Sequence, residues 1–201
     1  MAKGYRNIHI ATHGYFDLED SRSSMYGSCL LFAGVKNWGK QGEISRAYGN
    51  GMITADEVSR LDLRTVELAV LSSCYSGLND SIINKGFYGM IGAMSAAGVK
   101  YVVSHLWEAD DFATAILMDA FYYQYIQMQK TPPEALRLAK KYLKRVTVGE
   151  LKRCEWFKDI RKNNSDGRIR KLIEQYETAD ERIRPFKSEA YWSGFVCYQC
   201  R

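Results

Sequence analysis

The sequence predicts an α/β fold in which helices flank a mostly parallel central sheet. Short apolar runs alternate with helical patterns through the first half of the chain, and this alternation is typical of parallel sheets. The clearest strand patterns cover residues 8–12, 67–72 and 99–105. At 201 residues, with 46% hydrophobic and 25% charged side chains, the chain has the size and composition of one soluble globular domain, residues 1–201.

Signals for helices lie between and after these strands. Thr54 and Glu57 have the spacing of a capping box, which predicts a short helix that runs through Leu61. Gly98 ends a stretch of small residues, 86–97, that we expect to be a helix packed closely on the sheet. The other expected elements are helices over 112–128 and from Pro132-Pro133, strands over 28–33 and 190–199, and loops over 34–51 and 79–85.

Residues 148–187 differ from the rest of the chain. They are rich in charged side chains and contain a turn sequence at 163–167, so we expect a charged helical insertion around one break. Residues 130–201 carry 18 basic and 10 acidic side chains, whereas residues 1–129 carry 10 and 13. A basic surface can bind nucleic acid or an acidic protein, but solvated helix faces explain the same composition. We therefore expect nucleic acid to be an indirect partner at most.

The five cysteines are an odd number and too few for a disulfide framework at this length. They predict reduced thiols, which are typical of a cytoplasmic protein. Cys197 and Cys200 have CxxC spacing, but no second pair or nearby histidine accompanies them, so we expect them in a last strand. We expect no secretory signal at the start of the chain, and no apolar stretch reaches the roughly 18 residues of a membrane span.

Two strand patterns end in residues that carry chemistry. One run ends at His13-Gly14, and a stronger apolar run ends at Cys74, with Gly77 close behind. Reactive groups collect at the carboxyl ends of strands in open parallel sheets. The chain between the two runs is long enough for the crossover that parallel neighbours need. A general base and a thiol nucleophile at adjacent strand ends are the ingredients of a cysteine hydrolase.

The chemistry of such a site assigns a role to each of these residues. Cys74 would attack as a thiolate, which a nearby imidazole and adjacent backbone N–H groups favour. His13 would take the thiol proton and protonate the leaving amine, and the backbone N–H groups of Gly14 and Cys74 would hold the oxyanion. This mechanism needs no metal and no cofactor. Taken singly, an inert cysteine and a strand-capping histidine are the simpler interpretations, whereas the two together favour a site.

Two other histidines compete for the role of the base. His9 precedes His13 by an even number of residues on the same strand, so we expect it further back, in the core or on the sheet face. His105 ends the strand pattern 99–105 and would line the same cleft, but no glycine follows it. Both are weaker candidates than His13.

Three acids follow the strand pattern 99–105, namely Glu108, Asp110 and Asp111. At a strand end they would build an anionic pocket for a basic side chain. An Asp directly before an amphipathic helix is also typical of an N-cap, and the helix dipole favours acids in the first turn. The residues leave both roles open, and different acids can serve different roles.

Short segments along most of the chain resemble the motifs of one protein family, both in their residues and in their order along the chain. Residues 11–14 read Ala-Thr-His-Gly, residues 71–77 read Leu-Ser-Ser-Cys-Tyr-Ser-Gly, and residues 106–114 read Leu-Trp-Glu-Ala-Asp-Asp-Phe-Ala-Thr. They resemble the CHAT domain, a bacterial branch of the caspase-like, separase-like cysteine peptidases of clan CD. Other segments that fit the family, in order, are 28–34, 51–63, 86–98, 133–137 and 191–196.

The resemblance implies a caspase-like three-layer sandwich with His13 and Cys74 as the dyad that cleaves a protein or peptide substrate. Similarity to separase-like relatives makes Asp111, with Asp110 beside it, the candidate S1 acid, which would favour Arg or Lys before the scissile bond. The family has an earlier strand and helix, so we expect a fold truncated at its N-terminal edge and a chain that is a piece of a larger protein.

The resemblance also implies a setting of regulated proteolysis, including bacterial defence and cell death. The expected partners are a protein substrate and an attached or separate regulatory module, such as helical repeats. Two rival functions remain open. One is a non-catalytic interaction or scaffold domain with the same fold, and the other is a nucleic-acid-associated regulatory subunit that uses the basic segment 130–201. The intact pair of His13 and Cys74 favours the cysteine endopeptidase.

Overall fold

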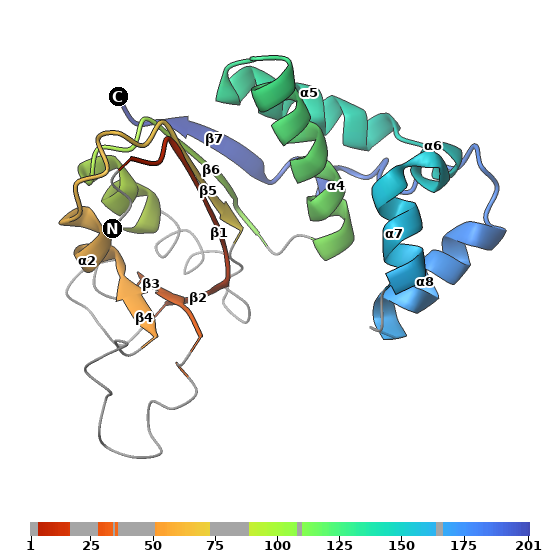
Figure 1. The fold of residues 1–201 in the computed structure, drawn as a ribbon, viewed down its shortest axis with the longest axis horizontal. Coiled ribbons are helices and arrows are strands. Elements are labelled where there is room, and N and C mark those ends of the chain that lie inside the picture. The colour runs from red at the N-terminus through yellow and green to blue at the C-terminus, as the bar shows by residue number, and fades with distance from the viewer. Residues whose placement is uncertain are drawn as a thin grey trace. The chain divides into compact units, whose positions relative to one another are not determined.

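The computed structural model describes residues 4–16, 28–33, 35, 51–72, 89–107, 110–163 and 167–201. Contacts divide the chain into two compact units. Unit 1 comprises residues 1–109, 131–133 and 194–201, and unit 2 comprises residues 110–130 and 134–193. Among the described residues, those of unit 1 form the strands and two helical segments, and those of unit 2 form mainly helices (Figure 1).

The central sheet of unit 1 has four strands in the order β1-β5-β6-β7. β1 (Asn7–Ala11) pairs in parallel with β5 (Leu68–Ser72), and β5 pairs in parallel with β6 (Tyr101–His105). β7 (Phe195–Gln199) joins the far side of β6 and is antiparallel to it. The predicted α/β fold with a mostly parallel central sheet and flanking helices is confirmed, and so is the parallel pairing of the two strands that lead to His13 and Cys74.

A second, antiparallel sheet follows β1 directly. Its strands are β2 (His13–Phe16), β3 (Ser28–Leu31) and β4 (Met52–Thr54), in that order. The first strand pattern therefore ends at Ala11, and His13 begins a new strand in a different sheet. The sequence did not separate these sheets, because the apolar spacing of a strand does not reveal which neighbours it pairs with. The expected loops 34–51 and 79–85 lie outside the described residues, apart from residues 35 and 51.

One face of the central sheet packs on two short helical segments. α2 (Ala55–Ser59) begins with the predicted capping box, in which Thr54 and Glu57 satisfy each other's backbone N–H groups. The described part of the small-residue stretch is helical over residues 89–96, and its Met90 and Met94 are buried in the core with Ala69 and Leu71 of the sheet. Gly98 ends this helix at a φ of +98°, where a side chain would be strained.

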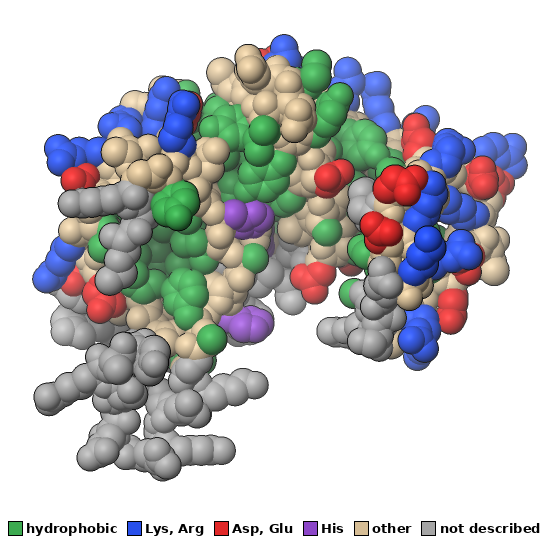
Figure 2. Space-filling model, in the orientation of Figure 1, with side chains coloured by type: hydrophobic (Ala, Val, Ile, Leu, Met, Phe, Trp, Pro, Cys, Tyr) green, Lys and Arg blue, Asp and Glu red, His purple; other side chains and the backbone are tan. Residues whose placement is uncertain are grey.

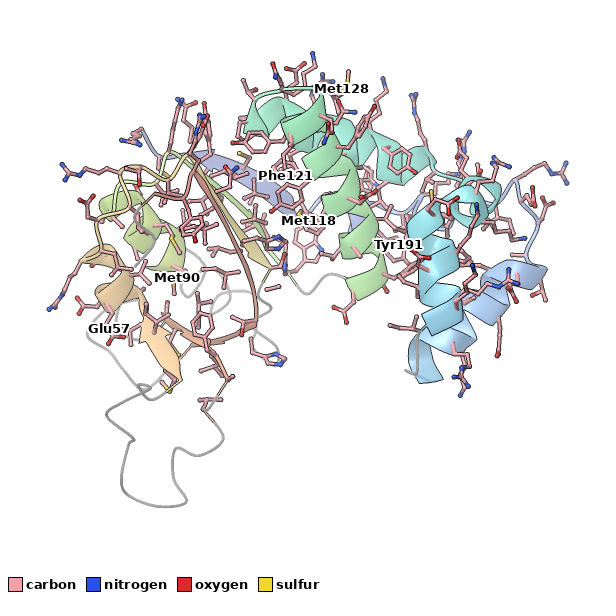
Figure 3. The ribbon with its side chains drawn as sticks, viewed as in Figure 1. Glu57, Met90, Met118, Phe121, Met128 and Tyr191 are labelled. Carbon is pink, nitrogen blue, oxygen red and sulfur yellow. The ribbon has the colours of Figure 1, made fainter. Side chains whose placement is uncertain are left out.

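Unit 2 is built from helices. α4 (Asp111–Tyr122) buries Ile116, Leu117 and Phe121, and Met118 and Phe121 are labelled on it in Figure 3. A π-helical turn, η2 (Tyr123–Gln127), continues it, so the predicted helix 112–128 is one α-helix with a wider last turn. α5 (Pro132–Arg145) starts at the predicted prolines. α5 buries Leu136, Ala139 and Leu143 on one side, and Val146 directly after the helix is buried as well.

The charged segment 148–187 forms three helices: α6 (Val148–Arg153), α7 (Glu155–Asn163) and α8 (Gly167–Thr178). Figure 2 shows basic and acidic side chains side by side on the visible face of α7 and α8. Arg161 lies 3.0 Å from a carboxylate oxygen of Glu177, and Lys158 lies 2.6 Å from one of Glu155. This alternation of signs is typical of solvated helix faces.

The expected last strand is shorter than the sequence pattern. A 3₁₀ turn, η3 (Glu189–Tyr191), occupies the aromatic start of the pattern 190–199, and β7 begins only at Phe195. Gly194, just before β7, packs against the ring of Trp107: an added β-carbon would lie 2.6 Å from a ring carbon, so a glycine is needed here.

Candidate active site

The end of β1 is fixed by Thr12, the residue between β1 and β2. Its backbone N–H donates to the carbonyl oxygen of Ser72, at the end of β5, over 3.3 Å. Its hydroxyl donates to the carbonyl oxygen of Leu31, at the end of β3. One residue thus ties together the ends of three strands from both sheets of unit 1, and the next residue in the chain is His13.

His13 opens β2, where it pairs with Leu31, and its side chain is exposed. Gly14 follows in the same strand, pairs with Leu30 and is half-buried. An exposed imidazole on an anchored backbone suits a general base, because the ring can reach a substrate while its Cα stays in place. The structure thus places the expected base, His13, at the surface of unit 1, directly after the anchored residue Thr12.

Cys74, the expected nucleophile, lies outside the described residues, two positions after Ser72 in the sequence. Cys29, Cys154, Cys197 and Cys200, the cysteines that the structure describes, form no disulfide. Three of these thiols have raised pKa values. Burial raises the pKa of Cys197 to about 12, and burial is also the main cause of the raised pKa of Cys154 and Cys200.

Raised pKa values make these thiols poor nucleophiles, because the thiolate is the reactive form. Cys29 is a core residue of β3 with 3% of its surface exposed. Its burial removes it from contact with a substrate. Among the described cysteines, none has the exposed, easily ionised thiol that a nucleophile needs, and Cys74 remains the candidate.

His9 lies on the face of the central sheet, beside the strand that leads to Cys74. Its Nε2 lies 3.2 Å from the hydroxyl oxygen of Ser72. Desolvation lowers the pKa of His9, so its ring is neutral over more of the physiological pH range than an ordinary imidazole. The expectation of a sheet-face residue is confirmed, although the side chain is exposed and not part of the core.

The carboxyl end of β5 is also held from its other side. The paired register of β5 and β6 runs as far as Val70 and Val103. The buried hydroxyl of Ser104 then donates to the carbonyl oxygen of Leu71 over 3.2 Å. The carbonyl groups of Leu71 and Ser72, the last two described residues before Cys74, thus accept hydrogen bonds from Ser104 of β6 and from Thr12, the residue after β1.

His105 at the end of β6 is a structural residue. It is 6% exposed, and its ring packs on Phe195 of β7 with centroids 5.4 Å apart. Nδ1 lies 2.7 Å from the carbonyl oxygen of Trp107. A carbonyl can only accept, so Nδ1 carries the proton. Desolvation lowers the pKa of His105 more than this bond raises it, which keeps the ring neutral and unsuited to line an open cleft as a base.

The acidic pair begins unit 2. Asp110 is the N-cap of α4 and accepts from the backbone N–H of Ala113 over 2.8 Å, and Asp111 is exposed in the first turn. The predicted capping role therefore belongs to Asp110. Glu108 lies outside the described residues. His13 belongs to unit 1, so the structure assigns the proposed base and the proposed specificity acids to different units.

Phe112, next to this pair, anchors the start of α4 to the charged segment. Its ring centroid lies 6.4 Å from that of Phe157 in α7, 5.8 Å from Tyr176 in α8 and 6.2 Å from Phe186. Aromatic pairs at these separations add roughly 0.5–1.5 kcal/mol each beyond the burial of their area. The first turn of α4, in which Asp111 lies, is thus packed through Phe112 on the aromatic rings of residues 148–187.

A metal site and a membrane span are both missing from the described part of the chain. Within the described ranges, no three His, Cys, Asp or Glu side chains are grouped so that they could hold a metal ion. The helices there include none with the length and apolar content needed to cross a membrane.

Comparison with known families decides the relationship. The CHAT domain family model matches residues 1–199, nearly the whole chain. The chain belongs to the CHAT domain family. This family is related to the caspase-like cysteine peptidases, and the mostly parallel sheet with β1 beside β5 is consistent with a caspase-like sandwich. No curated protein matches the CHAT chain significantly.

The sequence of this CHAT domain did not predict the contacts of Thr12 and Phe112, which hold the backbone near the candidate site residues. Thr12 stands inside the Ala-Thr-His-Gly segment, but only the three-dimensional structure shows its bonds to Ser72 and Leu31. Phe112 begins the predicted helix 112–128. Its position directly after the acidic pair is too general a signal to indicate a contact with α7 and α8.

Proposed function

We propose that this CHAT domain is a cysteine endopeptidase that cleaves a protein substrate with His13 and Cys74. The hydrogen bond from the N–H of Thr12 to the carbonyl of Ser72 is the observation that carries the proposal. It joins the residue before His13 to the strand that leads to Cys74. Cys74 follows the end of that strand by two positions in the sequence.

The reaction that fits these groups is acyl transfer through a thioester. Cys74 Sγ, once its proton has passed to His13, forms a bond to the carbonyl carbon of the scissile peptide. The carbonyl oxygen becomes an oxyanion, which the N–H groups of Gly14 and Cys74 would stabilise. His13 then gives its proton to the leaving amine as the C–N bond breaks. Water, deprotonated by His13, attacks the thioester and releases the acid and the thiol.

The specificity of the proposed enzyme rests on the start of α4. Asp111 is exposed in the first turn, whereas one oxygen of Asp110 already caps the helix. Asp111 is therefore our first candidate for the S1 acid, with Asp110 beside it. A carboxylate in S1 favours Arg or Lys before the scissile bond, because it offsets the charge that such a side chain buries.

We further propose that the domain is the effector part of a larger regulated protein, in bacterial defence or cell death. The family resemblance suggests this setting. The contacts of Phe112 support a regulatory or docking role for residues 148–187, because this segment packs on the residue that follows the proposed specificity acids in the chain. A partner that moves the segment would therefore also move Asp111.

The central test compares two cysteine variants of the full chain. Cys74→Ala should abolish cleavage of a library of peptides with Arg or Lys before the scissile bond, and Cys154→Ala should leave it unchanged. Cys154 is the matched control, because it is a described thiol with a raised pKa. Cleavage that survives Cys74→Ala would rule out the proposed mechanism.

Thiol alkylation gives a second measurement that needs no substrate. An activated cysteine reacts with iodoacetamide at pH values well below the ordinary thiol pKa of about 8.5, because part of it is already thiolate. We expect Cys74 to be alkylated first at pH 6, and His13→Ala to slow its alkylation. Equal alkylation rates at Cys74 and Cys154 would favour the non-catalytic scaffold.

A further inference from the structure

Unit 2 contains a pocket that the proposed catalytic chemistry does not use. Its volume is about 330 Å³, and its walls come from α8, from the start of α6 and from the segment that leads to η3. Leu172, Ile183 and Phe186 give it apolar surface, and Tyr176 and Tyr191 add two phenol rings. A pocket of this volume with apolar walls and a few polar groups is typical of a ligand site.

The charge of the pocket contrasts with the charge of the sequence around it. Residues 130–201 carry 18 basic and 10 acidic side chains. Asp110 is the single charged side chain among the described residues that line the pocket, and its neighbours there include no Lys or Arg. A ligand in this pocket therefore meets one carboxylate with no basic side chain in the lining to neutralise it.

The polar groups of the pocket lie close together. Tyr191, labelled in Figure 3, packs edge-on against Phe186 with centroids 5.3 Å apart. The pKa of Tyr176 is raised to about 12, first by burial and then by the negative charge of Asp110 and by Tyr191. The same carboxylate that caps α4 thus acts electrostatically on the hydroxyl of Tyr176.

Capping leaves Asp110 able to bind a cation. One oxygen accepts from the N–H of Ala113, and a carboxylate offers about four acceptor positions on its two oxygens. The residue is exposed, so a ligand can reach it without disturbing the helix. The faces of tyrosine rings attract cations as well, and methylene stems of basic side chains pack readily on apolar walls.

We propose that this pocket binds the side chain of a lysine or arginine in a peptide segment, with the cation at Asp110 and its methylene stem against the apolar walls. It is a recognition site separate from the S1 position assigned to Asp111, which is not among its lining residues. The pocket would bind a second basic residue of a protein ligand, in addition to the one that S1 binds. This inference does not depend on cleavage by Cys74.

The test measures peptide binding to the Cys74→Ala full chain, so that no cleavage interferes. The probes are acetyl-Gly-Arg-Gly-amide, its lysine analogue and its norleucine analogue, which has an apolar side chain of similar length and no charge. NMR signals of the Tyr176 and Tyr191 rings report occupancy of the pocket. We expect both basic peptides to shift these signals in a saturable titration, and the norleucine peptide to bind about tenfold more weakly.

Matched variants separate the charge of Asp110 from its cap. Asp110→Asn keeps an N-cap of similar strength but removes the charge, and it should weaken binding about tenfold. Asp119→Asn removes an exposed charge from the same helix outside the pocket and should leave binding unchanged. Equal binding by these two variants would overturn the proposal, as would equal binding of the norleucine peptide.

Asp111→Asn decides between this pocket and S1. Binding that is lost in Asp111→Asn and kept in Asp110→Asn would show that the probe occupies S1, and would overturn the proposal.

KM values for longer peptides with a second basic residue then show whether the natural ligand is a substrate or a partner. If substrates are the ligands, Asp110→Asn should raise KM by a larger factor for dibasic than for monobasic peptides in the Cys74-containing enzyme. If the ligand is a partner or another segment of the protein, Asp110→Asn should change KM by the same factor for both kinds of peptide.

Discussion

The ends of β1 and β6 both lead to a histidine, and the two histidines have opposite surroundings. After β1, Thr12 bonds to its neighbours and leaves the side chain of His13 exposed. At the end of β6, His105 is 6% exposed, and its own ring makes the bond, to the carbonyl of Trp107. At the end of β1 the hydrogen bonds of Thr12 hold the backbone, whereas at the end of β6 the imidazole of His105 itself holds it.

This difference leaves His13, unlike His105, with the exposed ring that the proposed proton transfer requires. A ring that is used to hold the backbone cannot also exchange protons with a substrate, because it is buried and its donor is occupied. At the end of β1 the hydrogen bonds that hold the backbone come from Thr12, so the ring of His13 is not needed for them. The comparison can be tested by removing each residue and asking whether activity or stability is lost.

The largest effect is expected for His13→Ala. If His13 transfers protons, kcat/KM should fall about 10²–10⁴-fold, with little change in the free energy of unfolding, because the side chain is exposed. The measurement is cleavage of the best peptide substrate together with urea unfolding. His9→Gln is the control, and we expect it to change kcat/KM by less than about threefold. A loss of equal size in both variants would contradict the assignment of the base.

His105→Gln should affect stability instead of proton transfer. The substitution removes a buried ring from Phe195 and disturbs the bond to Trp107, so the free energy of unfolding should fall by about 2–4 kcal/mol. Urea denaturation at pH 7.5 measures this change. Unchanged stability, combined with a loss of activity as large as that of His13→Ala, would reverse the roles of the two histidines.

The same residue predicts a dependence of stability on pH. The pKa of His105 is lowered in the folded protein from its ordinary value of 6.5, so the unfolded chain binds more protons below that pH. This contribution to stability is complete above pH 6.5 and is lost as the pH falls toward the folded pKa. His105→Gln should flatten that part of the curve. His9 has a lowered pKa too, so the comparison is best made in a His9→Gln background.

The smallest effect is expected for Thr12. Thr12→Val keeps the shape of the side chain but loses the bond from the hydroxyl to Leu31, and should cost about 0.5–1.5 kcal/mol of stability. Because His13 follows directly, we also expect kcat to fall more than KM rises. Thr12→Ser retains the hydroxyl and should restore most of both. If serine fails to rescue either quantity, the hydroxyl does not position His13.

The sequence predicted most of the elements because their signals are local. The capping box at Thr54, the glycine stop at Gly98 and the prolines that begin α5 each depend on a few neighbouring residues. The division of the first strand pattern into β1 and β2 was missed. It depends on hydrogen bonds from Thr12 to residues 19 and 60 positions away, which no periodicity within the strand encodes.

The candidate site was predicted to a similar extent. The sequence placed His13 and Cys74 after neighbouring parallel strands, and β1 and β5 do pair in parallel. It left the acids between two roles, and the structure gives the cap to Asp110. The aromatic contacts of Phe112 were not predictable, because they join residues more than 40 positions apart through a core that only the folded segment creates.

Phe112 also limits how this molecule can change. Its ring shares a packed core with rings from two helices and from the chain beyond them, while its neighbours along the chain are the two acids. Residues 148–187 are therefore not an interchangeable module, although their charged surface suggests one. Transplanting a segment of different size at this place would leave a void or a clash under the first turn of α4. Residues 148–187 and the start of α4 with Asp110 and Asp111 are therefore expected to change together in evolution, because Phe112 links them.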